Sequence, residues 1–278
     1  MPRHIVCLTF DFDAMTGFIA RGMTTPTPIS RGEFGLVGLP RILDLLRAHG
    51  IRSTFFVPGV VIDMFPVACE RIVSAGHEIG HHGYTHVPPA SLSRQQETEG
   101  LVKGNEAIVR IAGKPARGYR SPSWDLSPNT VELLLEHGFV YESSMMGNDY
   151  TPYYARQGDQ IRLEEPCAWG RATRLVEMPI SWTLDDYPHF EFVRTQSHVV
   201  QGLMNAHDVL QNWIDDFLYM QRIVDWGVLT YTMHPYVIGR GHRMLMLERL
   251  ILRLTELGAV FAAMEEAASE FMKRVPRG

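Results

Sequence analysis

Apolar positions along this chain follow a repeated pattern: an amphipathic run, a glycine, and then a short run rich in β-forming residues. In the first complete unit, leucines and an isoleucine between residues 39 and 46 share one helical face, Gly50 follows, and residues 53–57 form the strand-like run. Glycine adopts the left-handed cap conformation at little cost, so it predicts the end of each helix. Further units end at Gly76, Gly113, Gly138 and Gly258.

Helices that alternate with strands predict a parallel sheet covered by helices, which is an α/β fold. So many units favour a barrel over an open sheet, and we expect residues 1–278 to form one catalytic domain. Strands are expected at residues 5–10, 53–57, 77–79, 117–120, 139–141, 228–233 and 260–261. Residues 15–38 and 151–174 lack a clear period, so we expect long loops there, and long loops are usually functional.

Composition and charge limit the kinds of partner and the cellular compartment that we expect. The net charge is −5 and no run rich in lysine or arginine occurs, which argues against a nucleic-acid partner. No stretch approaches the roughly 20 apolar residues of a membrane span, and the start of the chain does not resemble a signal peptide. The three cysteines are widely spaced, which indicates reduced thiols. We therefore expect a cytoplasmic protein without a membrane partner.

Polar residues with catalytic potential follow four of the predicted strands. In α/β barrels the reacting groups lie where strands end and loops begin, so side chains from these four places are expected to converge. They are Asp11 and Asp13, His82 and His86, Arg120, and His234.

His82 and His86 are candidate metal ligands. A four-residue spacing places two imidazoles on one side of a helical turn, close enough to share an ion, although a surface pair is the alternative for this common spacing. The neighbouring His77 and His81 leave open which pair binds. An aspartate from another strand end would complete a set of two histidines and one carboxylate, which suits catalytic zinc and also iron or cobalt.

Asp11 and Asp13 alternate along an extended chain, so both side chains would point the same way. A metal site can use one carboxylate as a ligand and the other as a base. The alternative is a pair of capping aspartates in a βα loop. Because two close carboxylates repel each other, a nearby cation is expected, and Arg120 is a candidate for it beside the metal itself.

His234 stands at the end of the late strand, which favours a catalytic role over that of a core histidine. Asp185 and Asp186 could orient its ring, or they could lie in a solvated loop. Four residues are candidates for the wall of a substrate cleft, the three aromatic ones equally for the core: Trp124, Tyr150, Trp182 and Asp185.

The motifs TFDFD, HHGYTH, YRSPSW and TMHP, in this order, resemble the signature motifs of the polysaccharide deacetylase family from Thr9 to about Pro235. The stretches SMMGNDYTPYY and LVEMPISWTLDD further resemble its leaderless branch, which includes a bacterial peptidoglycan deacetylase, cyclic imide hydrolases and relatives of allantoinase. The resemblance implies a distorted (β/α) barrel of seven or eight units. It also implies a divalent metal, usually Zn²⁺ with Co²⁺ or another divalent ion as alternatives, and a homo-oligomer.

The resemblance assigns a role to each motif residue. The roles are metal ligands for Asp13, His82 and His86, catalytic base for Asp11, partner of the base for Arg120, general acid for His234, and an oxyanion-binding backbone N–H near Ser123. Phe12 separates the aspartates and Ala14 replaces the usual glycine, which is the pattern of the branch and makes Asp13 the ligand. No clear copy of the motif that tunes the acidic histidine occurs, so the partner of His234 stays open. Some relatives of allantoinase work without the metal ligands, but all three are present here.

The sequence therefore predicts a metal-dependent hydrolase of non-peptide carbon–nitrogen (amide) bonds that removes an acyl group from an N-acylated amino sugar. The alternative substrate is a small cyclic imide or ureide, which a cytoplasmic location would favour. A non-haem iron oxygenase is disfavoured because such enzymes usually carry their ligands on a double-stranded β-helix. A non-catalytic barrel is disfavoured by the complete set of acid, base and ligands. Neither the substrate, the physiological metal nor the oligomeric state can be read from these residues.

Overall fold

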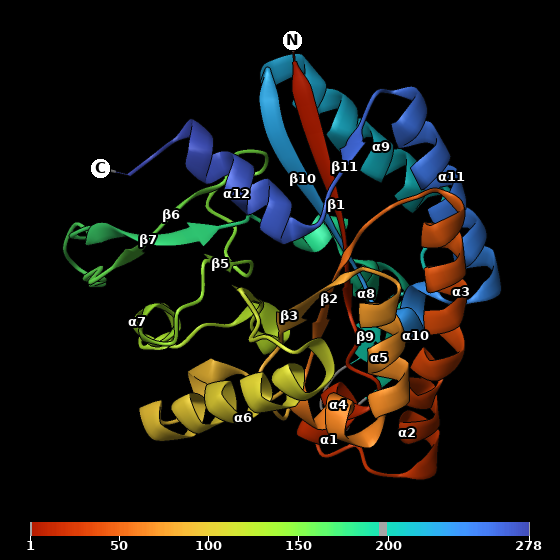
Figure 1. Ribbon diagram of the computed structural model, residues 1–278, viewed down its shortest axis with the longest axis horizontal. Coiled ribbons are helices and arrows are strands. Elements are labelled where there is room, and N and C mark those ends of the chain that lie inside the picture. Colours follow the sequence, from red (N-terminus) through yellow and green to blue (C-terminus); the bar gives the residue numbers. More distant parts are fainter. Residues whose placement is uncertain (1, 195–198, 278) are drawn as a thin grey trace.

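A curled sheet of parallel strands forms the centre of the computed structural model, which describes residues 2–194 and 199–277 (Figure 1). Within these residues seven parallel strands follow one another in the order β10 (Trp226–Met233), β1 (Arg3–Asp11), β2 (Thr54–Val57), β3 (Glu78–His81), β4 (Gly118–Tyr119), β5 (Tyr141–Glu142) and β7 (Arg171–Glu177). β6 (Tyr153–Gln157) adds antiparallel to β7, and β11 (Val260–Phe261) pairs with the start of β1.

The two sides of this sheet approach each other without forming a full ladder. The chain beyond β7 reaches Asp185, which makes an isolated parallel bridge to Thr232 of β10. β4 and β5 have only two residues each, so the sheet is irregular on that side. The predicted α/β barrel is confirmed as a distorted, incompletely closed one. Seven parallel strands form the main path of the sheet in the described residues and the short β11 is an eighth, parallel to β1, which agrees with the predicted seven or eight units.

β1 lies inside the sheet, and its sequence explains that place. Residues 5–10 are buried throughout, as expected for a nearly continuous apolar run in a parallel strand that is covered on both faces. The strand pairs with β10 from Arg3 opposite Trp226 to Phe10 opposite Met233. This long ladder fixes the C-terminal end of β1, where the first candidate aspartate stands.

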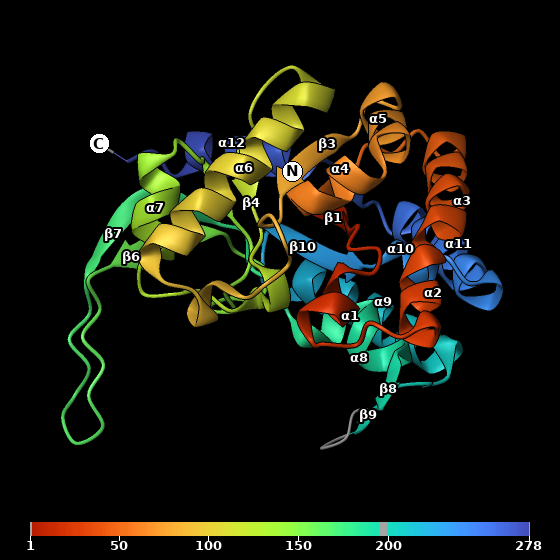
Figure 2. The ribbon, with the colours of Figure 1, turned by 90° about the horizontal axis from the view of Figure 1, so that it is seen from below.

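Helices cover the outside of the sheet (Figures 1 and 2). The longer ones are α3 (Gly35–Ala48), α5 (Pro66–Ser74), α6 (Arg94–Ala112), α9 (Ala206–Ile223), α11 (Gly241–Glu256) and α12 (Met264–Arg274). The shorter ones include α1 (Thr16–Ala20), α2 (Pro26–Glu33), α4 (Gly59–Met64), α7 (Thr130–Glu136), α8 (Asp186–Phe190) and α10 (Pro235–Ile238). All the glycines predicted to end helices have a positive φ, between 64° and 83°, which confirms the helix–glycine–strand pattern.

Residues 15–38, expected as a long loop, contain α1, α2 and the start of α3, so that prediction is wrong. Close backbone approach at glycines packs these helices. A Cβ added to Gly32 would lie 2.4 Å from the Cα of Met15, and one added to Gly38 would lie 2.0 Å from the carbonyl oxygen of Pro235. Packing through glycine leaves no apolar stripe in the sequence, which is why periodicity gave no signal.

Residues 151–174, the other expected loop, include β6 and the start of β7, so this prediction is wrong as well. The two strands form a hairpin whose connection projects far from the body (Figure 2). Their burial is mixed and does not alternate regularly, so the strand period is weak in the sequence. Among the described helices, none combines the length and apolar character that a bilayer span requires.

Candidate metal centre and active site

Most predicted site residues meet in one cleft of about 90 Å³ at the C-terminal ends of the parallel strands. The predicted residues that line it are Asp11, Asp13, His82, His86, Ser123, Trp124, Trp182, Asp185 and His234. Arg120 lies beneath, fully buried. Sequence reasoning missed four lining residues: Gly17, Arg21, Tyr187 and Tyr236. The first two fall in the segment without periodicity, and Tyr187 and Tyr236 directly follow residues that had been singled out.

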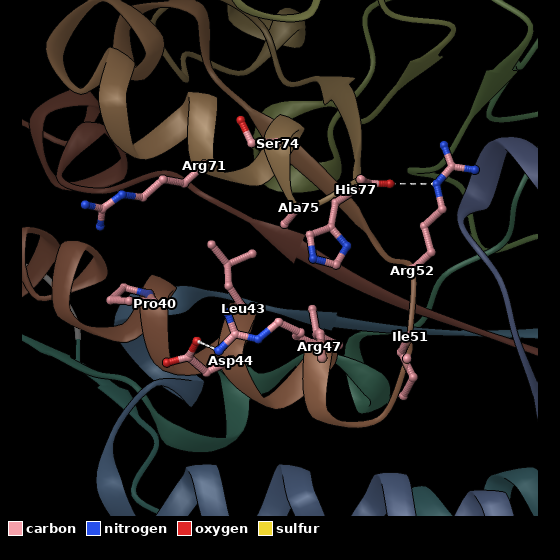
Figure 3. Close-up of a pocket in the computed structure, with 13 residues that line it drawn as sticks. Pro40, Leu43, Asp44, Arg47, Ile51, Arg52, Arg71, Ser74, Ala75 and His77 are labelled. Carbon is pink, nitrogen blue, oxygen red and sulfur yellow. Dashed lines mark hydrogen bonds and ion pairs between the residues drawn. The ribbon is translucent and has the colours of Figure 1, made fainter.

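A larger cavity lies elsewhere, as a groove of about 660 Å³ between α3 and α5 (Figure 3). Its carboxylate, Asp44, is paired with Arg47. The ring of His77 lies in the groove, and burial, followed by the charge of Arg52, lowers its pKa to about 4, so it is neutral at pH 7. One histidine and one paired carboxylate do not make a metal or acid–base site, so the smaller cleft holds the chemistry.

Asp13, His82 and His86 form a compact buried triad in the cleft. Their ligand atoms all lie within 4.8 Å of one another. The Nε2 atom of His82 lies 3.4 Å from Oδ1 of Asp13, and that of His86 lies 3.2 Å from Oδ2. Burial alone would raise the pKa of Asp13, but His86 above all, with His82 and His234, lowers it below its usual range. Asp13 is therefore an anion aimed at two imidazoles.

A loop, and not a helical turn, delivers the two histidines. The chain after β3 turns at Gly83, with φ at 68°, and His86 itself has φ at 61°. The predicted helical turn is therefore wrong, because the left-handed residues break any helix between the two rings. The ring centroids nevertheless lie 5.0 Å apart, so the loop achieves the proximity that the spacing suggested. A left-handed histidine is uncommon and marks a position where backbone strain is tolerated for the site.

Hydrogen bonds prepare the triad for a cation. Nδ1 of His82 lies 2.7 Å from the carbonyl oxygen of Arg120, so Nδ1 carries the proton and Nε2 keeps a lone pair toward Asp13. Oδ1 of Asp13 is buried and has no hydrogen-bond partner in the part of the chain that the structure describes. A divalent cation would satisfy this oxygen and both Nε2 atoms, so the residues fit such an ion.

The other two histidines of this stretch point away from the triad. Nε2 of His81 lies 3.1 Å from the carbonyl oxygen of Leu101, and its Nδ1 accepts the backbone N–H of Gly83. Nδ1 of His77 accepts the backbone N–H of Ser53. Of the four histidines, His82 and His86 are therefore the pair that faces the aspartate.

Asp11 is held by Arg120. Nη1 of Arg120 donates to Oδ1 of Asp11 at 2.8 Å, and the guanidinium also donates to Thr9 and to both the carbonyl and hydroxyl oxygens of Ser143. The other carboxylate oxygen, Oδ2, lies 3.9 Å from Nε2 of His82. One oxygen of Asp11 is thus fixed by a buried cation, while the other faces the triad.

His234 is oriented by Asp186. Nδ1 of His234 lies 2.7 Å from Oδ1 of Asp186, and its backbone N–H donates to Oδ2 at 3.0 Å. Nε2 lies 3.6 Å from Oδ2 of Asp13, so it faces the triad. Burial lowers the pKa of His234, but Asp185 and Asp186 together raise it well above its usual value. Both aspartates are buried, so the alternative of a solvated loop is wrong.

Aromatic rings form one wall of the cleft. Trp124 and Trp182 stack with ring centroids 4.1 Å apart, and Trp182 is 44% exposed. Ser123 and Trp124 have φ at 57° and 56°, a strained pair that turns the chain toward the cleft. Tyr150 does not line it: its hydroxyl donates to Asp216 at 3.3 Å and its ring is buried. The prediction for Tyr150 is corrected, because the chain before β6 carries it away from the strand ends.

Comparison with known proteins decides the family. The sequence model described as Polysaccharide deacetylase matches residues 1–141. A peptidoglycan deacetylase from Helicobacter pylori is 39% identical, over 98% of this chain and 98% of its own length. The chain belongs to the polysaccharide deacetylase family. As a member of it, the protein is a hydrolase of carbon–nitrogen bonds other than peptide bonds, as predicted.

Solved structures agree with the family at the level of the fold. A candidate polysaccharide deacetylase from Mycobacterium smegmatis shares 31% identity with a TM-score of 0.87, covering all of this chain and 93% of that one. Puue allantoinase superposes with a TM-score of 0.81 at 21% identity, over 100% of this chain and 93% of that one, which shows a shared fold alone. The polysaccharide deacetylase fold therefore includes enzymes of different named activities.

Proposed function

We propose that this polysaccharide deacetylase uses a divalent metal, Zn²⁺ in the first place and Co²⁺ or another divalent ion as alternatives, to remove an acyl group from an N-acylated amino sugar. The observation that carries the proposal is the buried triad of Asp13, His82 and His86 beside an arginine-paired aspartate and an aspartate-paired histidine. Two histidines and one carboxylate leave positions free for water and substrate.

Asp13, His82 and His86 would hold the metal, which supplies Lewis-acid polarisation and a more acidic bound water when present. Asp11 would take the proton of the attacking water through Oδ2, because Arg120 occupies Oδ1. Arg120 also holds the carboxylate of Asp11 in place.

His234 would protonate the departing nitrogen, since an amide anion is a poor leaving group. Its raised pKa keeps the ring protonated for this step, and Asp186 holds Nε2 toward the triad. The backbone N–H near Ser123 would bind the developing oxyanion, an interaction worth about 3 kcal/mol in the barrier.

A metal-reloading experiment tests the proposal. Protein stripped by a chelator should be inactive, and Zn²⁺ or Co²⁺ should restore release of acetate from acetylated chitooligosaccharides or peptidoglycan fragments. Asp13→Ala and His82→Ala should lose both bound metal and turnover, whereas Asp11→Asn should keep the metal and lose rate. His207→Ala, at an exposed histidine of α9, is the control and should change neither. Full activity in metal-free protein would overturn the proposal.

A cyclic imide or ureide is the second candidate substrate. The cleft is narrow, about 90 Å³, and stacked tryptophans form its wall, which suits a small flat ring as well as an acetamido group. Succinimide, hydantoins and allantoin therefore belong in the same activity panel, and their exclusive turnover would select this alternative. The cytoplasmic location and the homo-oligomeric state stay predictions.

A further inference from the structure

Arg21 is an exposed cation at the edge of the catalytic cleft. It follows α1 and lines the same cavity as the triad. Nη1 donates to the carbonyl oxygen of Gly17 at 3.2 Å and to the hydroxyl of Tyr187 at 3.4 Å, and the guanidinium lies 5.7 Å from the centre of the Tyr187 ring. Within residues 2–194 and 199–277 it makes no salt bridge to a carboxylate. Its charge and the N–H groups of Nη2 and Nε are thus available to a ligand.

The position of Arg21 connects it to the reacting centre. A Cβ added to Gly17 would lie 3.6 Å from Nη1 of Arg21 and 3.6 Å from Cε1 of His86. The guanidinium and a histidine of the triad therefore both border the space beside the Cα of Gly17. On its other side, the ring of Tyr187 lies 5.7 Å from that of His234. A substrate that reaches both the triad and His234 would carry its neighbouring substituent past Arg21.

The other charged groups of the cleft indicate which kind of substituent Arg21 can bind. Asp11 and Asp13 are carboxylates, Arg120 is buried and already bound to Asp11, and the ring of His234 is paired with Asp186. At the edge of the cleft, away from the triad and from His234, an anionic substituent would find in Arg21 a cation that no carboxylate of the described residues neutralises. A planar guanidinium binds a carboxylate through paired hydrogen bonds, which a neutral hydroxyl cannot match.

We propose that Arg21 binds a carboxylate of the substrate next to the acylated nitrogen, so that acidic N-acyl amino sugars are preferred to neutral ones. The inference rests on the proposed function, because it names the substrate class of that same site. The alternative role for Arg21 is structural: it follows the last turn of α1 and its bond to Gly17 satisfies a helix carbonyl. The two roles make different kinetic predictions.

A substrate pair that differs only in charge separates them. N-acetylmuramic acid and the methyl ester of its lactyl carboxylate should be compared on zinc-loaded protein. Wild type should show a KM for the acid about ten-fold below that for the ester, as one charge-assisted contact at an exposed site allows. Arg21→Gln should raise the KM for the acid about ten-fold more than the KM for the ester, so that the difference between the two compounds disappears. Arg21→Lys should recover part of the preference.

Arg41→Gln is the matched control. Arg41 also donates to a backbone carbonyl, that of Gly239 at 2.9 Å, and also lies over an aromatic ring, that of Phe34, but outside the cleft. It should keep the preference for the acid. Equal loss on acid and ester in Arg21→Gln, or no preference in wild type, would overturn the inference.

Calorimetric binding of the acid and the ester to metal-free protein distinguishes the two proposals. Stronger binding of the acid to wild type, lost in Arg21→Gln, supports the role of Arg21 even if no acetylated amino sugar of the panel is hydrolysed, in which case the proposed function fails. Hydrolysis of both compounds without a difference in binding or KM leaves the proposed function intact and removes the role of Arg21.

Discussion

Asp186 provides what His234 needs to act as an acid. Its two carboxylate oxygens accept from the ring and from the backbone of the same residue, so they fix both the tautomer and the direction of Nε2. The negative charges of Asp185 and Asp186 raise the pKa of the ring against the effect of burial.

Replacing Asp186 by asparagine should therefore change how activity depends on pH. The loss of a negative charge lowers the pKa of His234, so the acid loses its proton at lower pH. We expect the alkaline limb of the kcat profile to move to lower pH, and kcat at neutral pH to fall about ten-fold to a hundred-fold. An unchanged alkaline limb, measured by titrating kcat from pH 5 to 10, would show that His234 does not supply the rate-limiting proton.

The position of the catalytic side chains could be predicted from the sequence, because they stand at or just after the ends of apolar strands and strand ends converge in this fold. The sequence left the partner of His234 open, because an Asp-Asp pair before a tyrosine and a proline suits a solvated loop equally well. The packing of α8 against β10, which buries Asp186, is a tertiary contact that no local pattern reports. Arg21 gave no signal for the same reason.

At the scale of elements, Glu142 and Glu177 form a buried acidic pair where β5 and β7 end. The two residues stand opposite each other in the sheet, and both side chains are fully buried. Backbone N–H groups of Ser144 and Met145 donate to them at 3.0 and 2.9 Å. Burial, and then the charge of its partner, raises the pKa of Glu177 well above its usual value, so the folded state favours a proton on the pair.

This pair should make the fold less stable as the pH rises. In the unfolded chain both carboxyls ionise near their ordinary pKa of about 4.3, whereas the folded state keeps a proton on the pair. Above that pH the folded state binds more protons, so the free energy of unfolding falls by up to 1.4 kcal/mol per pH unit for about one proton, until the folded pKa is passed. Glu177→Gln should flatten this fall in urea unfolding between pH 5 and 9, while parallel curves for the two proteins would contradict it.

The boundaries of helices and strands were predicted correctly where a glycine or a buried strand marks them. They were missed where the apolar residues that pack an element have no regular spacing in the sequence. β1, β2, β10 and α3 follow the pattern of the sequence closely. The two-residue strands β4 and β5 owe their pairing to their neighbours, and the polar helix α2 packs through Gly32. The turn between His82 and His86 depends on left-handed residues whose effect a spacing rule does not include.

The whole molecule brings the triad together from separate parts of the sheet. Asp13 follows β1, which is locked to β10, and the histidines follow β3, with β2 between the two strands. In the described residues the two sides of the sheet meet through an isolated bridge between Asp185 and Thr232. We therefore expect a cross-link between strand ends to stabilise this sheet more than it would stabilise a fully closed barrel. A cation bound to the triad would be such a cross-link.

Zinc should consequently raise the unfolding temperature of the protein. An ion that binds the folded state alone adds about 2.7 kcal/mol at a hundred times its dissociation constant. A chain of this size gains about 2–4 °C for each kcal/mol, so we expect a rise of about 5–10 °C in calorimetry, reversed by a chelator. His82→Ala should abolish the rise, because Asp13 and His86 alone would hold the ion too weakly, whereas His207→Ala should retain it. If Asp13→Ala showed a rise of the same size, the stabilising ion would bind somewhere other than the triad. The inference that a cation links the ends of β1 and β3 would then be wrong.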